Sequence, residues 1–268
     1  MPDKAQPKHL DTRELIAPGL VIKYHSGRKP DDATKRFLRS STSIARSVMR
    51  STVWEVDKIV LFHRDEPDWM TETLDKHFCL NRDPALASTK DAKGKLVNAK
   101  ARRKYLSGVR KVMLSISFHL NTGAYLLDVD AGHRMSVGDF AIDNLGAGWQ
   151  EQNPAGANVV SRNIEGYVQK RDGLMKTLGG SSSGGIHVGF SLGSAFGYSP
   201  ERMARIIIHE ATHKYCYTDD VKYCHDPNYD VESPVTMAKN ADSFAYAAMS
   251  IGAKEMLDYN GLIGYSYT

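Results

Sequence analysis

Apolar residues recur every three or four positions in several parts of the chain, which is the spacing of an amphipathic helix. The first such stretch begins at Asp31 or Asp32, either of which suits a helix cap, and its apolar positions continue to about residue 50. The same spacing predicts helices over 69–80 and over 100–120. The chain is therefore expected to be mostly helical.

Between these helices the pattern is irregular. Residues 53–62 show no clear period, and 63–67 indicate a turn. Residues 81–99 are rich in Asp, Lys, Ala and Gly, which favours a linker. We therefore divide the chain into an N-terminal helical region, 1–99, whose independence the sequence leaves open, and a second region, 100–268.

Strand character is found in the second region. The predicted strands cover 125–129, 135–140 and 186–190. The glycine-rich segments 146–156 and 179–185 are predicted loops. The expected fold class is α+β, mostly helical with a small mixed sheet.

Composition is that of a globular protein, with 268 residues of which 41% are hydrophobic and 25% charged. The first eleven residues lack the apolar core of a signal peptide, and no apolar stretch is long enough for a membrane span. We expect no membrane span, and a protein that is cytoplasmic or exported by a signal-independent route. The sequence does not indicate the oligomeric state.

The formal net charge of +4 is too small to indicate a nucleic-acid partner. Basic residues are nevertheless frequent between Lys90 and Lys111. No series of aromatic residues for base stacking accompanies them, which favours a solvated helix face and linker over a nucleic-acid site.

The strongest chemical motif is His-Glu-x-x-His at His209, Glu210 and His213. Residues four apart lie one turn above each other on a helix, so both imidazoles can reach one ion. Zinc accepts neutral imidazole ligands, and the adjacent glutamate can act as a general base in hydrolysis.

The flanking residues favour a helix here. Ser199 and Pro200 form a helix start, with a hydroxyl cap followed by proline at the first helical position. The apolar run 206–208 predicts buried surroundings, in which an unpaired pair of histidines is costly and a metal ion would satisfy them.

A third ligand is expected after the helix. The candidates are Asp219, Asp220, His225 and Asp226. Of these, Asp219 also fits the longer spacing of another zinc-protease pattern, which however requires glycine where this chain has Cys216.

Two further motifs follow, Thr218-Asp219-Asp220-Val221-Lys222-Tyr223 and Asn240-Ala241-Asp242-Ser243. With His-Glu-x-x-His, they resemble the aspzincin, or deuterolysin-type, zinc metalloendopeptidases. The resemblance covers about residues 185–250 and implies a zincin-like catalytic domain with one catalytic Zn2+ ion. It implies that Asp220 is the third zinc ligand and that Tyr223 assists the transition state.

The chain departs from that family at two places. Members usually carry glycine before the threonine and after the tyrosine, where this chain has Tyr217 and Cys224. The turn that carries Asp220 must therefore be built without those permissive residues. In the zincin architecture an edge strand binds the substrate antiparallel, and residues 186–190 are expected to have this role.

Asp242 lies within an apolar stripe that predicts one helix from Ser233 to about Met256. A buried carboxylate requires a fixed partner. It would accept the second ring proton of a ligand histidine, line a substrate pocket, or be a purely structural, helix-bonded residue away from the metal. The resemblance favours the site, because in some members of the family the pocket is acidic and selects basic residues.

Cys216 and Cys224 flank the Asp220 turn and are either two reduced thiols or a disulfide that closes it.

Two other functions compete with zinc-dependent hydrolysis of peptide bonds. Gly189-Phe190-Ser191-Leu192-Gly193 has the form of a serine-hydrolase nucleophile elbow. A binding module with purely structural zinc is the second alternative, but it would need a closed set of four ligands. The favoured function is a zinc endopeptidase acting on protein or peptide substrates, with a bacterial effector or toxin peptidase as one possible setting.

Overall fold

The computed structural model describes residues 12–24, 26–128, 166–168 and 186–257. It is a mixed α and β protein, mostly helical, with one small sheet. The predicted strand 135–140 and the predicted loops 146–156 and 179–185 lie outside the described residues. No helix in the described part of the chain is both long and apolar enough to cross a membrane.

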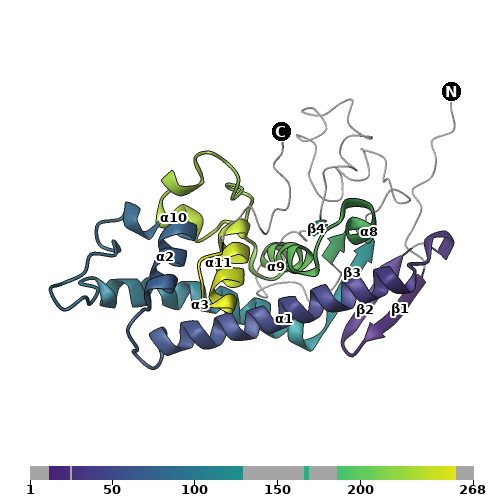
Figure 1. Ribbon diagram of the computed structural model, residues 1–268, viewed down its shortest axis with the longest axis horizontal. Helices are drawn as coiled ribbons and strands as arrows, with labels where there is room; N and C mark the ends of the chain where they lie inside the picture. The colour runs from purple at the N-terminus through teal and green to yellow at the C-terminus, as the bar shows by residue number, and fades with distance from the viewer. Residues whose placement is uncertain (1–11, 25, 129–165, 169–185, 258–268) are drawn as a thin grey trace.

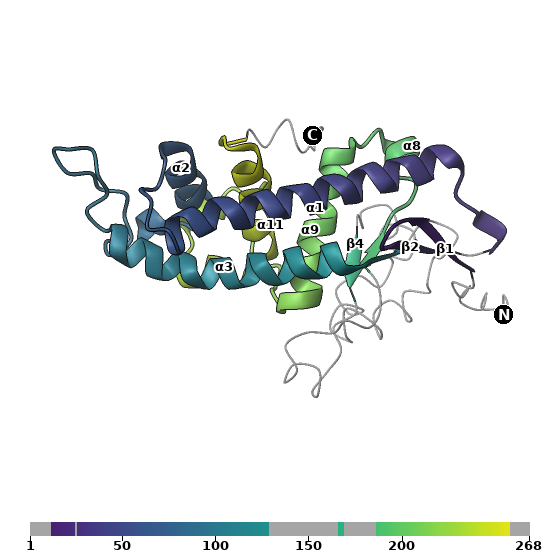
Figure 2. The same ribbon diagram turned by 90° about the horizontal axis from the view of Figure 1, so that it is seen from below.

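Two long helices, α1 (Asp32–Val60) and α3 (Ala99–Thr122), lie side by side along the length of the molecule (Figures 1 and 2). The Asp31 side chain caps α1 by accepting a hydrogen bond from Thr34 N at 2.7 Å. The prediction that α1 ends near residue 50 was wrong. Thr52 and Glu55 face inward, where Thr52 donates to Ala248 O and Glu55 pairs with Lys254. Because polar residues occupy these buried positions, the apolar period cannot be followed past residue 50 in the sequence.

Three further helices cross or flank this pair. They are α2 (Asp68–His77), α9 (Pro200–Cys216) and α11 (Ala241–Ala253). Helix α9 packs on α1, α3 and α11, so it lies at the centre of the helical layer (Figure 1). Two short helices complete the described set, α8 (Leu192–Phe196) and α10 (Pro234–Met237).

The sheet lies at one end of the two long helices. Its strands are β1 (Thr12–Ala17), β2 (Leu20–Tyr24), β3 (Ala124–Asp128), β4 (Gly166–Val168) and β5 (Ile186–Val188), in the order β1-β2-β3-β5-β4. Strands β2, β3 and β5 are parallel neighbours, whereas β1 and β4 pair antiparallel at the two edges. The mixed sheet agrees with the sequence prediction.

Two details of the sheet differ from expectation. Strand β5 was expected to be the substrate-binding edge, but it lies between β3 and β4, so its backbone hydrogen-bonding groups are used within the sheet. The β1–β2 hairpin was not predicted. The Pro18-Gly19 dipeptide, which is typical of turns, could have predicted it, and Gly19 adopts φ 64° there.

One buried cluster contains side chains from both sides of residue 99. It includes Leu38, Met49, Leu74, Met113 and Ile207, together with residues of the sheet and of α11. The segment predicted to be a linker, 81–99, is fastened to this core, because Arg102 of α3 donates to Leu86 O at 2.7 Å.

Part of the basic stretch 90–111 is neutralised by ion pairs, one of them in the interior. The Arg102 side chain is fully buried and pairs with Glu66 at 2.6 Å and Asp75 at 2.8 Å. Other pairs join Lys90 to Asp68, Lys95 to Asp65 and Arg110 to Asp57. The expectation of a merely solvated face was therefore wrong for Arg102.

Candidate metal centre

Helix α9 begins where the sequence predicts. The Ser199 hydroxyl accepts a hydrogen bond from Arg202 N at 3.2 Å, and Pro200 occupies the first turn. Residues 202–215 are all buried. The two histidines of α9 are therefore held in a closely packed environment.

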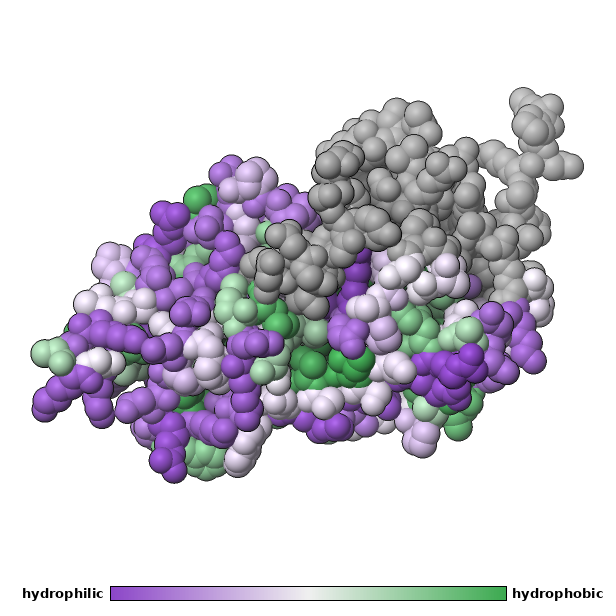
Figure 3. Space-filling view, in the orientation of Figure 1, coloured by the Kyte–Doolittle hydropathy of each residue, from purple (hydrophilic) through white to green (hydrophobic). Residues whose placement is uncertain are grey.

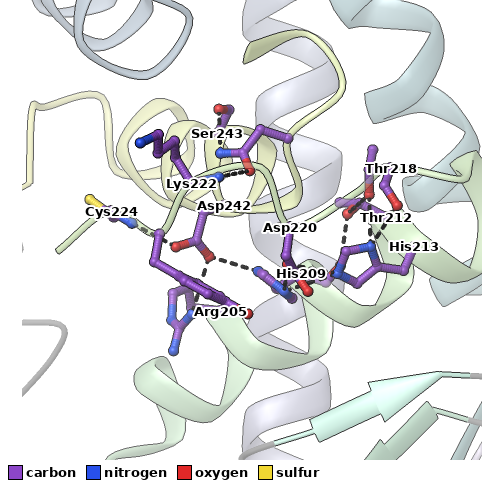
Figure 4. A network of polar contacts seen from close by, with 12 residues as sticks. Arg205, His209, Thr212, His213, Thr218, Asp220, Lys222, Cys224, Asp242 and Ser243 are labelled. Carbon is purple, nitrogen blue, oxygen red and sulfur yellow. Dashed lines mark hydrogen bonds and ion pairs between the residues drawn. The ribbon is translucent and has the colours of Figure 1, made fainter. Parts of the chain in front are cut away.

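His209 and His213 lie on one face of α9, one turn apart. Their Nε2 atoms are 3.1 Å from each other, and Oδ1 of Asp220 is 3.1 Å from each of them (Figure 4). Asp220 comes from the loop after the helix, and its side chain is 40% exposed. These three residues form a group that could hold a metal ion.

The second nitrogen of each ring determines which way the lone pairs point. Nδ1 of His213 is 2.8 Å from Thr218 O, and Nδ1 of His209 is 2.7 Å from Asp242 Oδ1. A carbonyl or a carboxylate can only accept, so both Nδ1 atoms carry protons. The neutral rings therefore direct two Nε2 lone pairs and the Asp220 carboxylate toward one point, an arrangement that requires a cation or an added proton.

The pKa values of His209 and Asp220 also indicate that a cation or a proton is needed between the ligand atoms. Burial disfavours a charged His209, but hydrogen bonds to Asp220 and Asp242 raise its pKa to about 10. Burial likewise opposes ionisation of Asp220, yet the hydrogen bonds to both histidines hold its pKa well below its usual range. Without a metal ion, the site would therefore retain a proton between its ligand atoms.

The Asp220 loop is fastened to the start of α11. Oδ1 of Asn240 accepts from Val221 N at 3.0 Å and from Lys222 N at 3.1 Å. The backbone of Asp219 pairs with that of residues 239 and 241 at 2.8 and 3.0 Å. These bonds fix the position from which Asp220 reaches the histidines.

Asp242 is buried in the first turn of α11. Oδ1 accepts from His209, while Oδ2 accepts from Cys224 N at 2.8 Å, and Arg205 Nη1 lies 3.6 Å from Oδ1. Burial opposes its ionisation, but the bond to His209 and the charge of Arg205 lower its pKa. Because both oxygens are engaged within the fold, this geometry favours orienting His209 over lining a substrate pocket.

The predicted helix from Ser233 to Met256 is in fact two helices. It is interrupted between Met237 and Ala241, where Asn240 is extended at φ −90° and ψ 125°. The apolar period continues across the interruption, so it gave no indication of the break. The interruption frees the Asn240 side chain to hold the Asp220 loop.

Glu210 is buried next to His209 on α9. Burial raises the pKa of its carboxyl group, and the nearby His209 and His213 oppose part of that rise. Tyr223 is 43% exposed and stacks on His225, with ring centroids 5.6 Å apart. Partial burial and the negative charges of Asp220, Asp242 and Glu210 raise the pKa of its phenol well above its usual range.

Of the candidate third ligands, only Asp220 belongs to the metal-binding group found among the described residues. Asp226 accepts from Tyr223 N at 2.8 Å, and His225 stacks on Tyr223. Tyr217, where the resembled family has glycine, adopts the left-handed conformation at φ 56° that glycine favours. Cys224 is not among the residues with positive φ, so only the first departure carries backbone strain.

All three cysteines are free thiols in this structure. Cys216 lies against α3, with its Sγ 3.7 Å from Val112 O, and burial raises its pKa to about 11. The thiol is therefore protonated at neutral pH.

The segment 189–193 does not have the geometry of a nucleophile elbow. Ser191 precedes α8 at φ −83° and ψ −2°, without the strain typical of that turn. Gly193 has a packing role, because an added Cβ would lie 3.0 Å from the Phe37 ring of α1. In this alternative the acid would be Asp219 or Asp220 and the base His225, which follow Ser191 in the required order. Asp220 contacts the metal-facing histidines instead, and His225 stacks on Tyr223.

The sequence did not indicate that three residues, Thr218, Asn240 and Arg205, hold the site residues in place. Thr218 bonds His213, Asn240 holds the Asp220 loop, and Arg205 lies beside Asp242. Asn240 belongs to the Asn-Ala-Asp-Ser motif, which was the only available signal. Thr218 acts mainly through its carbonyl, which no side-chain pattern reveals.

No family model, curated protein or solved structure matches the chain.

Proposed function

We propose that the protein is a zinc-dependent endopeptidase of aspzincin-like type, in which His209, His213 and Asp220 hold the ion. The observation that supports it best is the convergence of two Nε2 atoms and one carboxylate oxygen, each 3.1 Å from the other two. Ligand atoms of a tetrahedral zinc site with bonds of about 2.0–2.1 Å are separated by about 3.3 Å. The donor set therefore fits zinc in both chemistry and spacing.

A zinc ion bound there would polarise a peptide carbonyl and acidify water. Glu210 supplies a carboxylate that can accept a proton from water and return it to the leaving amine. Its raised pKa makes it a stronger base toward that water.

Tyr223 is proposed to stabilise the reacting carbonyl. Its raised phenol pKa keeps the hydroxyl protonated at neutral pH, so it can donate a hydrogen bond to the oxygen as negative charge develops. Its 43% exposure leaves it accessible to a substrate. Asp242 and Thr218 contribute by orienting the two histidines.

A structural metal site would be closed by a fourth protein ligand. The metal-binding group in the described residues contains three, with Glu210 beside it. This composition favours catalysis over a binding module.

The decisive experiment is Glu210→Gln, assayed for bound zinc and for cleavage of an unstructured protein. We expect zinc to be retained and the rate to fall by about a hundredfold to ten-thousandfold, the usual contribution of a general base. Ser191→Ala is the matched control and should retain both zinc and activity. Chelation should abolish cleavage and zinc should restore it. Activity near wild type in Glu210→Gln would reject the mechanism.

A further inference from the structure

Positive charge is concentrated in two parts of the chain, 12–54 and 90–111, both away from the metal centre in sequence. Residues 12–54 contain nine Lys and Arg against three Asp and Glu, a net charge of +6. The whole chain has a net charge of +4, so the remaining residues together have −2. The β1–β2 hairpin and the first three-quarters of α1 are thus one of two strongly basic parts of the chain. The other, 90–111, contains nine Lys and Arg against one Asp and includes the ion-paired Arg102 and Arg110.

Four arginines on α1 carry much of this charge, namely Arg36, Arg39, Arg46 and Arg50. Arg46 donates to the carbonyls of Leu120, Pro18 and Gly19, and Arg50 donates to Asn121 Oδ1 at 2.7 Å. Among the described residues, no carboxylate forms an ion pair with any of the four. Their charge is therefore not cancelled locally, in contrast to Arg102 and Arg110.

Large apolar side chains are exposed beside these arginines. Trp54 of α1 is 55% exposed, and Leu114 and Phe118 of α3 are 43% and 61% exposed. The contacts of Arg50 with Asn121 and of Arg110 with Asp57 set the antiparallel register of the two helices. Trp54 lies between residues 50 and 57, so it faces the part of α3 between 110 and 121, which carries Leu114 and Phe118.

These side chains lie on the outer side of the helix pair. The buried stripe of α1, which includes Leu38, Ala45 and Met49, packs toward α9 and α11. Figures 1 and 2 show α9 and α11 on one side of the pair and α1 and α3 alone on the other. The space-filling view shows hydrophilic residues over much of the visible face, including the end that holds the hairpin (Figure 3).

We propose that this basic-aromatic face, made of Arg36, Arg39, Arg46, Arg50, Trp54, Leu114 and Phe118, docks on the surface of an anionic lipid bilayer. Arginines attract anionic headgroups, and exposed Trp, Phe and Leu side chains enter the boundary between headgroups and acyl chains. A nucleic acid would instead need aromatic rings interleaved with the charges along a groove. Here the apolar side chains form a group of their own at one end of the arginine series.

The proposal is independent of zinc chemistry and can be tested by binding alone. The full-length protein is sedimented with vesicles of phosphatidylcholine, either pure or mixed with phosphatidylglycerol. Binding is expected only to the anionic vesicles and should be lost at high salt. Arg36→Glu/Arg50→Glu should weaken it at least about thirtyfold, since about 1 kcal/mol for each basic residue removed corresponds to about fivefold.

The matched control is Lys93→Glu/Lys100→Glu, which changes the net charge equally on exposed residues outside this face. It should bind almost as wild type does. Trp54→Ser/Phe118→Ser should also weaken binding, whereas Val235→Ser, at a 69% exposed site, should not. Circular dichroism verifies folding, and Arg36→Gln/Arg50→Gln replaces the charge reversal if that variant unfolds.

Three results would overturn the proposal. The first is equal binding to neutral and anionic vesicles, or none to either. The second is an equal loss of binding in the control pair, which would indicate a response to net charge only. The third is binding of a single-stranded oligonucleotide, abolished by the same arginine substitutions, without vesicle binding.

Discussion

The two metal-facing imidazoles are oriented by acceptors of different kinds. Thr218 uses its backbone carbonyl for His213, whereas Asp242 uses a side chain for His209. Only the second contact can be removed by substitution, which makes Asp242 the residue where the orientation of a ligand can be tested directly.

Asp242→Asn should lower metal affinity by about tenfold to a hundredfold, the usual effect of losing such an outer contact. An amide has one acceptor oxygen, but His209 Nδ1 and Cys224 N both donate at this position. One of them would face an NH2 group instead. Competition with a metal-sensitive dye measures the effect, with Asp219→Asn as the control. Unchanged affinity would show that Asp242 does not position His209.

Metal binding at neutral pH should release about one proton per ion. The pKa of His209 without metal is raised to about 10, so at neutral pH its ring is protonated, and the metal must displace that proton. Affinity should therefore rise with pH until about that value. Calorimetry in buffers of different protonation enthalpy counts the protons, and a count of zero would contradict this charge assignment.

At the scale of elements, the interruption between α10 and α11 matters most for the site. It leaves Asn240 extended, so that one side-chain oxygen holds two backbone N–H groups of the Asp220 loop. The third ligand is thus positioned by the beginning of a helix that lies about twenty residues later in the chain.

Asn240→Ala should reduce the free energy of unfolding by about 1–3 kcal/mol, because it removes two hydrogen bonds from backbone N–H groups, each contributing about 0.5–1.5 kcal/mol. It should also weaken metal binding, since Asp220 would no longer be held against the histidines. Urea denaturation and a metal titration measure the two effects. Ser243→Ala, which removes only a partner of the Asn240 amide, is the control and should retain metal affinity.

At the scale of the whole molecule, Arg102 joins the two regions, 1–99 and 100–268, whose independence the sequence left open. Its fully buried guanidinium contacts Glu66, Asp75 of α2 and the carbonyl of Leu86. Helix α3 is thereby joined to α2, to the segment after α1 that carries Glu66, and to the 81–99 segment.

Arg102→Met should lower the free energy of unfolding by about 3–5 kcal/mol, because it leaves two carboxylates with little solvent contact and no cation. Lys104→Met, two residues away on the exposed side of α3, should change it by less than about 0.5 kcal/mol. Urea denaturation compares them. A loss in Arg102→Met no larger than in the control would show that the buried pairs contribute little to stability.

The sequence by itself determined the features that depend on residues close together in the chain. A cap and a proline begin α9, the four-residue spacing brings His209 and His213 to one face, and apolar periods locate α1, α2 and α3. Such signals are local, so they can be recognised without knowing the fold.

Only the tertiary structure decided which distant groups meet. It selected Asp220 for the metal group, turned Asp242 toward His209, placed β5 inside the sheet and buried Arg102 among acids. It also brought Trp54 of α1 to the same face as Leu114 and Phe118 of α3. These outcomes depend on packing between segments far apart in the chain, and neither spacing nor composition carries that information.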